Sequence, residues 1–138
     1  MNVSYEVIAN NFDLAGEASS KLKVLLQRIG VPANVIRRIA IGTYEAEMNV
    51  IIHAGHDGKV EANITPDKTT VIISDDGPGI ENTELALKEG FSTAPDYVRA
   101  MGFGAGMGLP NMQKCSDKFK IQSACGQGTV ITMEFLHS

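Results

Sequence analysis

Residues 60–79 read VEANITPDKTTVIISDDGPG, and this stretch decides the fold class. Two segments rich in β-branched residues, Val60 to Thr65 and Thr69 to Ser74, predict two strands. Pro66-Asp67-Lys68 has the residues of a short turn, so the two strands should form an antiparallel hairpin. The second strand runs into Asp75-Asp76-Gly77-Pro78-Gly79, where glycine and proline end the extended segment.

The chain before this hairpin predicts one strand followed by two helices. Asn2 to Ile8 alternates loosely between apolar and polar residues, which is typical of a strand. Apolar residues recur at helical spacing from Leu14 to about Ile29, and Gly30 is a suitable C-cap. Pro32 fits the first turn of a second and longer helix over about Ala33 to Ala54.

The chain after the hairpin predicts a long glycine-rich connection, a short helix and two strands. Gly90 to Gly108 has few periodic apolar residues, and connections of this length are commonly lids. Leu109 to Cys115 is expected as a helix, and Phe119 to Ser123 and Thr129 to Phe135 as strands. Helices and strands segregate along the chain, which favours an α+β sandwich over a Rossmann fold. We therefore expect two layers, with helices on one face of a mixed, mostly antiparallel sheet.

The composition favours a globular cytoplasmic domain. The 138 residues fit one domain, and 43% of them are hydrophobic. A formal net charge of −4 argues against a broad electrostatic grip on nucleic acid. No apolar run approaches the ~20 residues of a bilayer span, and the N-terminus does not read as a signal peptide. Cys115 and Cys125 lack metal-ligand spacing and are expected to be reduced thiols.

Glu45 and Asn49 form the first candidate pair of functional residues. They lie four residues apart in the second predicted helix, so they share one helix face. A carboxylate can accept the proton of an attacking hydroxyl, and an amide oxygen can ligate Mg²⁺. Taken alone, the pair is more often a solvated helix face. Glu47 points to another side of a regular helix, so no role is assigned to it.

The segment that follows the second hairpin strand suits a flat nucleobase. A carboxylate at a strand end, here Asp75, can accept a hydrogen bond from an exocyclic amine such as that of adenine. Gly77 and Gly79 would let the backbone pass beside the base. Taken alone, this segment is more often an ordinary turn.

A second glycine-rich segment suits phosphate. Gly102 to Leu109 reads GFGAGMGL and precedes a predicted helix, so its backbone N–H groups and the helix N-terminus form a natural phosphate cradle. It has neither the Gly-Lys-Ser/Thr of a Walker motif nor the preceding strand of a dinucleotide-binding fingerprint. The last segment, Gly126-Gln127-Gly128-Thr129, carries little information by itself.

In this order, the four segments resemble the motifs of the GHKL ATPase family, which includes gyrase, the heat-shock chaperone, histidine kinases and MutL. Glu45-x-x-x-Asn49 is similar to the N box, and Asp75 to Gly79 to the first glycine box. Gly104 to Gly108 is similar to the second glycine box, and Gly128-Thr129 to the last motif. The resemblance extends from about Tyr5 to Phe135. Within the family, the chain is most similar to the stand-alone bacterial serine/threonine switch and anti-sigma-factor kinases (RsbT-, RsbW- and SpoIIAB-like).

The resemblance implies a Bergerat, histidine-kinase-like ATPase fold over residues 1–138, with ATP and Mg²⁺ as cofactors. It implies that Asn49 ligates Mg²⁺, that Glu45 is the general base, and that Asp75 holds the adenine. The other residues that it assigns to nucleotide contacts belong to the glycine-rich motifs: Gly77, Gly79, Gly104, Gly106, Gly108, Leu109 and Thr129.

The resemblance also implies the reaction and the partners. We expect a kinase that phosphorylates serine or threonine in a STAS-type antagonist protein, within a partner-switching module that controls a sigma factor. An alternative is an ATP-dependent anti-sigma factor or regulatory binding module with little kinase activity. Glu45 favours the kinase, because nucleotide binding alone needs no base. An isolated histidine-kinase ATP domain is the weaker alternative. A homodimer is left open, and no nucleic-acid or membrane partner is expected.

Overall fold

The computed structural model describes residues 1–8, 15–51, 57–75, 77, 108–123 and 128–138. The elements, in chain order, are β1 (Asn2–Val7), α1 (Glu17–Ile29), α2 (Ala33–Asn49), β2 (Gly58–Ile64), β3 (Lys68–Asp75), α5 (Gly108–Cys115), β4 (Lys118–Ser123) and β5 (Thr129–Leu136). Each of them matches an element predicted from the sequence. No helix in the described part of the chain is both long and apolar enough to cross a membrane.

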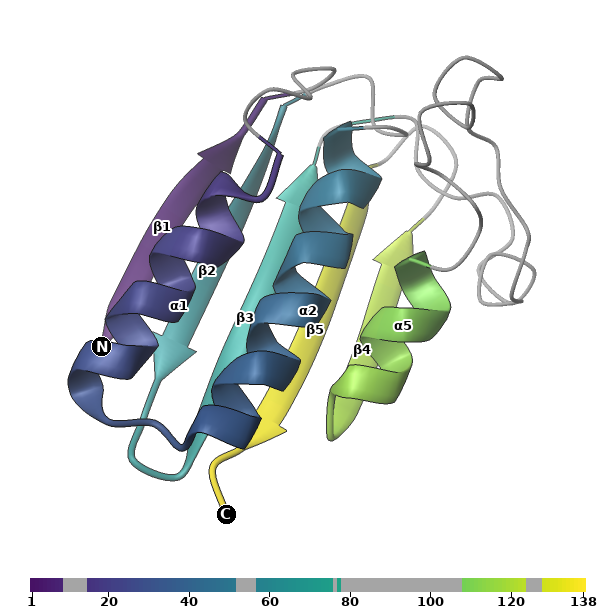
Figure 1. The fold of residues 1–138 in the computed structure, drawn as a ribbon. Helices are drawn as coiled ribbons and strands as arrows, with labels where there is room; N and C mark the ends of the chain where they lie inside the picture. Colours follow the sequence, from purple (N-terminus) through teal and green to yellow (C-terminus); the bar gives the residue numbers. More distant parts are fainter. Residues whose placement is uncertain (9–14, 52–56, 76, 78–107, 124–127) are drawn as a thin grey trace.

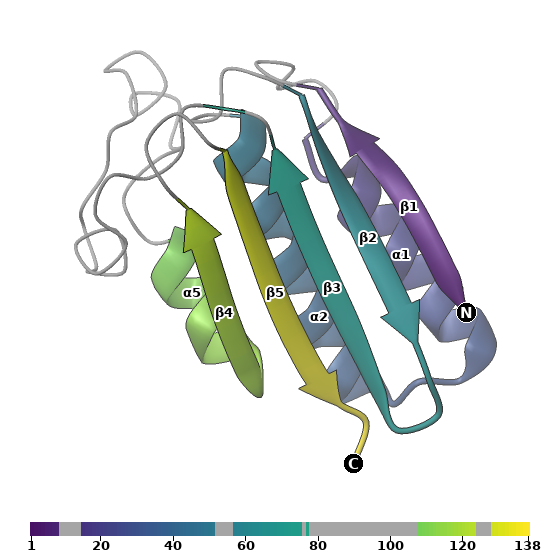
Figure 2. The ribbon, with the colours of Figure 1, turned by 180° about the vertical axis from the view of Figure 1, so that it is seen from behind.

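The strands form one sheet in the order β1-β2-β3-β5-β4. All four pairings between these described strands are antiparallel. The helices lie together on one face of the sheet, and the view from behind shows the other face without helices (Figures 1 and 2). The predicted two-layer α+β sandwich with a mostly antiparallel sheet is therefore confirmed.

The core lies between the helices and the strand residues that point toward them. Because side chains alternate along a strand, every second residue faces this layer, and the row Val60, Ile73 and Ile131 is almost fully buried. Burial of each such side chain stabilises the fold by about 1.5–3 kcal/mol. Helix α2 lies close to β5, because a Cβ at Gly42 would come within 3.1 Å of Phe135 Cζ.

The two ends of α1 differ in how well the sequence predicts them. Gly30 is the predicted C-cap, with a φ of 85° and its N–H directed at the carbonyls of Gln27 and Leu26. The predicted start at Leu14 is wrong, because the helix begins at Glu17. Gly16 precedes it with a φ of 88°, a left-handed conformation that interrupts a right-handed helix.

Helix α2 ends in a wider turn next to the predicted functional residues. The regular helix closes at Asn49, and Val50 and Ile51 continue it as one π-type turn. Turns of this type are often found at functional sites. The end predicted at Ala54 lies outside the described residues.

Candidate nucleotide site

The described residues of the four predicted motifs lie at one end of the sandwich. The last turn of α2, the end of β3, the start of α5 and the start of β5 all lie at the upper end in Figure 1. These positions belong to Asn49, Asp75, Gly108 and Thr129, which are far apart in the sequence. The antiparallel topology brings them together, because β3 ends where β5 begins and α2 runs toward the same end of the sheet.

The sheet contributes a row of polar and small residues at this end. Asp75 lies opposite Gly58 on one side and Thr129 on the other, and Thr129 lies opposite Ser123 of β4. Residues directly opposite in antiparallel strands have Cβ atoms about 4.5–5.5 Å apart. Asp75 shares a strand face with the buried Ile73, so the row is on the helix side of the sheet.

Gly58 allows α2 to approach this row. A Cβ at Gly58 would lie 2.8 Å from Val50 Cγ1 and 2.8 Å from the backbone oxygen of Ser74. Both distances are too short for a side chain, so the last turn of α2 rests directly on β2. The packing role of Gly58 was not predicted from the sequence. Asn49 is adjacent to Val50, so this contact also fixes the height of Asn49 above the sheet.

The hydroxyls of the row form a defined hydrogen-bond chain. Ser123 Oγ donates to the carbonyl oxygen of Gly128 at 3.0 Å and lies 2.9 Å from Thr129 Oγ1. Because a hydroxyl has one hydrogen, Thr129 is the donor to Ser123, and Thr129 Oγ1 keeps acceptor lone pairs. In the neighbouring strand, Asp75 Oδ1 accepts the N–H of Gly77 at 2.8 Å. This bond fixes one oxygen of the Asp75 carboxylate.

Glu45 lies at the contact between α2 and α5. Its Oε1 accepts a hydrogen bond from Asn111 Nδ2 at 3.4 Å, which joins the two helices. Burial raises the pKa of the Cys115 thiol, and the negative charge of Glu45 raises it further. Glu45 and Asn49 are both half-buried on α2. The structure thus gives Glu45 a neighbour, Asn111, that the sequence did not identify.

The second glycine box is described only at its end. Gly108 is the first residue of α5, and the side chain of Leu109 is buried in the core, where it anchors this helix. The first turn of α5 contains no acidic residue that would compete with an anion for its N–H groups. The predicted contacts at Gly79, Gly104 and Gly106 lie outside the described residues.

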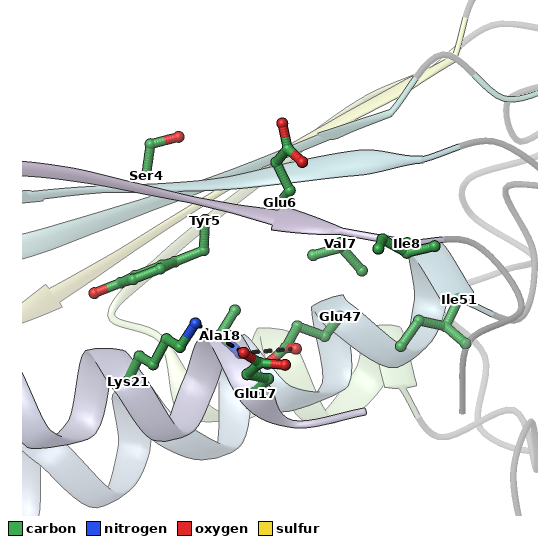
Figure 3. Close-up of a pocket in the computed structure, with 10 residues that line it drawn as sticks. All are labelled: Ser4, Tyr5, Glu6, Val7, Ile8, Glu17, Ala18, Lys21, Glu47 and Ile51. Carbon is green, nitrogen blue, oxygen red and sulfur yellow. Dashed lines mark hydrogen bonds and ion pairs between the residues drawn. The ribbon is translucent and has the colours of Figure 1, made fainter. Parts of the chain in front are cut away.

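Glu47 has a structural role that the sequence did not indicate. Its side chain is 2% exposed and accepts the backbone N–H groups of Ser19 at 2.7 Å and Ala18 at 3.2 Å. It therefore caps the first turn of α1, which has no side-chain cap of its own (Figure 3). Burial raises the pKa of Glu47, and the N–H hydrogen bonds offset part of this effect. In the sequence, only the position of Glu47 around the helix, on a different side from Glu45, indicated that the two carboxylates have different roles.

A pocket of about 320 Å³ lies elsewhere, between β1 and α1. Tyr5, Lys21 and Glu47 are among the residues that line it (Figure 3). Lys21 Nζ is paired with Glu17 Oε1 at 2.8 Å. None of the predicted site residues that the structure describes is among those lining this pocket, so it is distinct from the row at Asp75 and Thr129.

Comparisons with known sequences identify one family. The profile of the histidine kinase-like ATPase domain matches residues 8–135. The chain is 35% identical over 103 residues to the anti-sigma F factor of Thermoanaerobacter sp. (strain X514), covering 71% of this chain and 68% of that protein. It is 31% identical over 98 residues to the serine/threonine-protein kinase RsbT of Bacillus subtilis (strain 168), covering 68% of this chain and 67% of that protein.

Solved structures share the fold at low sequence identity. The RsbU and RsbW domains of Rv1364c from Mycobacterium tuberculosis superpose with a TM-score of 0.64 at 14% identity, over 99% of this chain and 32% of that one. The mycobacterial sensor histidine kinase MprB superposes with a TM-score of 0.55 at 16% identity, over 99% of this chain and 97% of that one. Because the family profile spans almost the whole sequence and relatives exceed 30% identity, the chain belongs to the histidine kinase-like ATPase domain family, which confirms the resemblance to GHKL proteins.

Proposed function

We propose that this chain is a cytoplasmic serine/threonine protein kinase that uses ATP and Mg²⁺ to phosphorylate a STAS-type antagonist protein. Residues 1–138 would act as one ATP-binding domain in a partner-switching module that controls a sigma factor. The observation that supports the proposal is that α2, which carries Glu45 and ends at Asn49, ends at the same end of the sandwich as the Asp75–Thr129 row. RsbT, one of the relatives, is named a serine/threonine-protein kinase.

The polar row suits adenine. An ionised carboxylate can accept several hydrogen bonds at once, so Asp75, which accepts the N–H of Gly77, would also accept the exocyclic amine of the base. The hydroxyl of Thr129 is already directed at Ser123, so Thr129 would offer its remaining lone pairs to a donor such as bound water. Gly77 and Gly79 would lie beside the base.

Asn49 and α5 suit the metal and the phosphates. Mg²⁺ prefers oxygen ligands and usually keeps several waters. The amide oxygen of Asn49 and oxygens of the phosphates would therefore be its other ligands. When bound, the metal ion would neutralise charge on the phosphates. The N–H groups at the start of α5, with Gly104, Gly106, Gly108 and Leu109, would contact the phosphates through the backbone.

The chemistry would be an in-line phosphoryl transfer. The bond between the γ-phosphorus and the oxygen that bridges to the β-phosphate breaks, and a new bond forms to the hydroxyl oxygen of a serine or threonine of the partner. Glu45 accepts the hydroxyl proton, and ADP leaves. Positioning and charge stabilisation supply most of the rate acceleration in reactions of this class.

A phosphate-transfer assay tests the proposal. Wild-type protein with Mg²⁺ and γ-labelled ATP should label a purified STAS-type antagonist. Glu45→Gln should lose transfer by about 100-fold or more and keep nucleotide affinity within about twofold. Glu61→Gln is the matched control, because Glu61 is exposed on the open face of the sheet. Full transfer by the Glu45→Gln variant would contradict the base assignment.

A second function remains a candidate because the relatives include anti-sigma F factors at 33–35% identity. In that case the chain would bind a sigma factor in an ATP-dependent way, with little phosphoryl transfer. Nucleotide-dependent capture of the sigma factor, without labelling of any antagonist, would favour this binding module over the kinase. A homodimer is compatible with both functions.

A further inference from the structure

We propose that Asn111 is a positioning residue for Glu45, and that it links the orientation of this carboxylate to the placement of α5. The inference rests on the proposed function, because it assigns Asn111 a role relative to the base of that reaction. The sequence motifs do not include Asn111.

The contact joins two elements that are distant in the sequence. Asn111 Nδ2 donates to Glu45 Oε1 at 3.4 Å, across 66 residues of chain. This is a long hydrogen bond, but its acceptor is a carboxylate, and such charge-assisted bonds are stronger than neutral ones. Because Asn111 holds one oxygen, the carboxylate loses rotational freedom and its second oxygen takes a defined direction. A base needs such a direction to meet the hydroxyl proton.

Helix α5 cannot easily move away from α2, so the donor is held in place. Leu109 and Met112, on either side of Asn111, are buried in the core with 6% and 0% exposure. At the other end of the contact, Arg38 Nη1 donates to the carbonyl oxygen of Cys115 at 3.3 Å. Arg38 and Glu45 are seven residues apart and therefore lie on one face of α2. The two helices run in opposite directions and are bonded at both ends of their contact (Figure 1).

The position of Asn111 in α5 connects this contact to the proposed phosphate site. Asn111 lies three residues after Gly108, in the first turn of the helix whose N-terminus would face the phosphates. Phosphates bound at that first turn would hold the Asn111 amide and, through it, the carboxylate of Glu45 in one orientation. Nucleotide binding and alignment of the base would thus be coupled through one side chain.

Cys115 and Arg38 are ionisable groups near the contact. Cys115 follows Asn111 by one turn on α5, and its thiol senses the charges of both Glu45 and Arg38. Its raised pKa keeps this thiol neutral near pH 7. A change in the pH–rate profile near neutrality on substitution of Asn111 would therefore not come from ionisation of Cys115.

Kinetics of three single variants and one double variant test the role. Asn111→Leu removes the donor and keeps the branched shape of the side chain, and we expect kcat to fall about tenfold while the KM for ATP changes less than about twofold. Asn111→Asp places a second carboxylate beside Glu45, which should displace the acid limb of the pH–rate profile to higher pH. Gln113→Leu is the matched control on the exposed side of α5 and should keep the wild-type profile. Adding Asn111→Leu to Glu45→Gln should cause no further loss.

Nuclear magnetic resonance gives a readout that does not depend on activity. The side-chain amide resonances of Asn111 should shift in Glu45→Gln relative to the wild type, whereas those of Gln113 should not. If the wild type transfers no phosphate, the proposed function fails, and if Glu45→Gln keeps full transfer, the base assignment fails. In both cases the amide shift still decides whether the contact between Asn111 and Glu45 exists. If Glu45→Gln loses transfer while Asn111→Leu keeps the wild-type rate and profile, or if the amide does not shift, the positioning role of Asn111 is overturned.

Discussion

Glu47 Oε1 accepts the backbone N–H of Ser19 at 2.7 Å, and this bond joins α2 to the first turn of α1. A helix leaves its first N–H groups without partners inside the helix, and Gly16, which precedes α1, has no side chain to satisfy them. A carboxylate from the neighbouring helix takes this place and also favours the positive end of the helix dipole. Glu47 is therefore a structural residue, two positions away from the proposed base.

Replacement of Glu47 should destabilise the fold in a way that depends on pH. Glu47→Gln keeps one acceptor oxygen but turns an amide group toward the second N–H, so we expect a loss of about 1 kcal/mol in the free energy of unfolding at pH 5. Urea unfolding measures this loss. Glu61→Gln, at an exposed position in β2, should change the free energy of unfolding by less than about 0.5 kcal/mol.

The direction of the pH dependence follows from the raised pKa of Glu47. The folded state then binds the proton more tightly than the unfolded chain, whose glutamate pKa is about 4.3. The contribution of Glu47 is therefore complete below that value and decreases as pH rises through the folded-state pKa. Because glutamine does not ionise, the difference between wild type and Glu47→Gln should shrink from pH 5 to pH 8. A difference that grows with pH would contradict this account.

Thr43 offers a substitution that should stabilise the protein. Its side chain is fully buried, and its hydroxyl has no hydrogen-bond partner among the residues that the structure describes. Thr43→Val removes the unsatisfied hydroxyl at nearly constant volume and helix propensity, so the free energy of unfolding should rise by about 1 kcal/mol. Thr70→Val in β3 is the control for a half-buried threonine. A lower midpoint of thermal unfolding for Thr43→Val would show that the hydroxyl is bonded.

Gly58 should be sensitive to the smallest possible addition. Its Cβ would lie 2.8 Å from the backbone oxygen of Ser74, which is held in the sheet and cannot yield as a side-chain end does. Gly58→Ala should therefore destabilise the fold by about 1–3 kcal/mol. It should also weaken ATP binding, because Val50 and the adjacent Asn49 are pushed from the sheet. Asn63→Ala in the same strand should leave ATP affinity unchanged, and an equal loss there would refute a local effect.

Asp75 should decide affinity for the base. Asp75→Asn keeps the size of the side chain but removes its charge, and the amide would present a donor to the exocyclic amine. We expect ATP affinity to fall about 10–100-fold, the loss expected when a charged hydrogen bond is removed. Asp67→Asn in the β2–β3 turn is the matched control. Unchanged ATP affinity of Asp75→Asn by calorimetry would remove Asp75 from the site.

The local parts of the fold could be predicted from the sequence. The β2–β3 hairpin follows from two β-branched segments around Pro66-Asp67, and the end of α1 follows from Gly30. Glu45 and Asn49 share a helix face because of their spacing alone. These features depend on neighbours in the chain, so pattern and propensity are sufficient to find them.

Contacts between distant elements could not be predicted. The pairing of Asp75 with Thr129 requires β5 to insert between β3 and β4, which depends on how the chain returns after α5. The cap that Glu47 provides requires α1 to start beside α2, and the Glu45–Asn111 bond requires the α2–α5 contact. Helical phase placed Glu47 apart from Glu45 but gave no indication of its partner.

Calorimetry with ATP and ADP, each with and without Mg²⁺, tests the proposed nucleotide site most directly. The account predicts that one nucleotide binds per wild-type chain, that Mg²⁺ strengthens the binding, and that Asn49→Ala loses this strengthening while it remains folded. The absence of any binding heat with both nucleotides in the presence of Mg²⁺ would contradict the account.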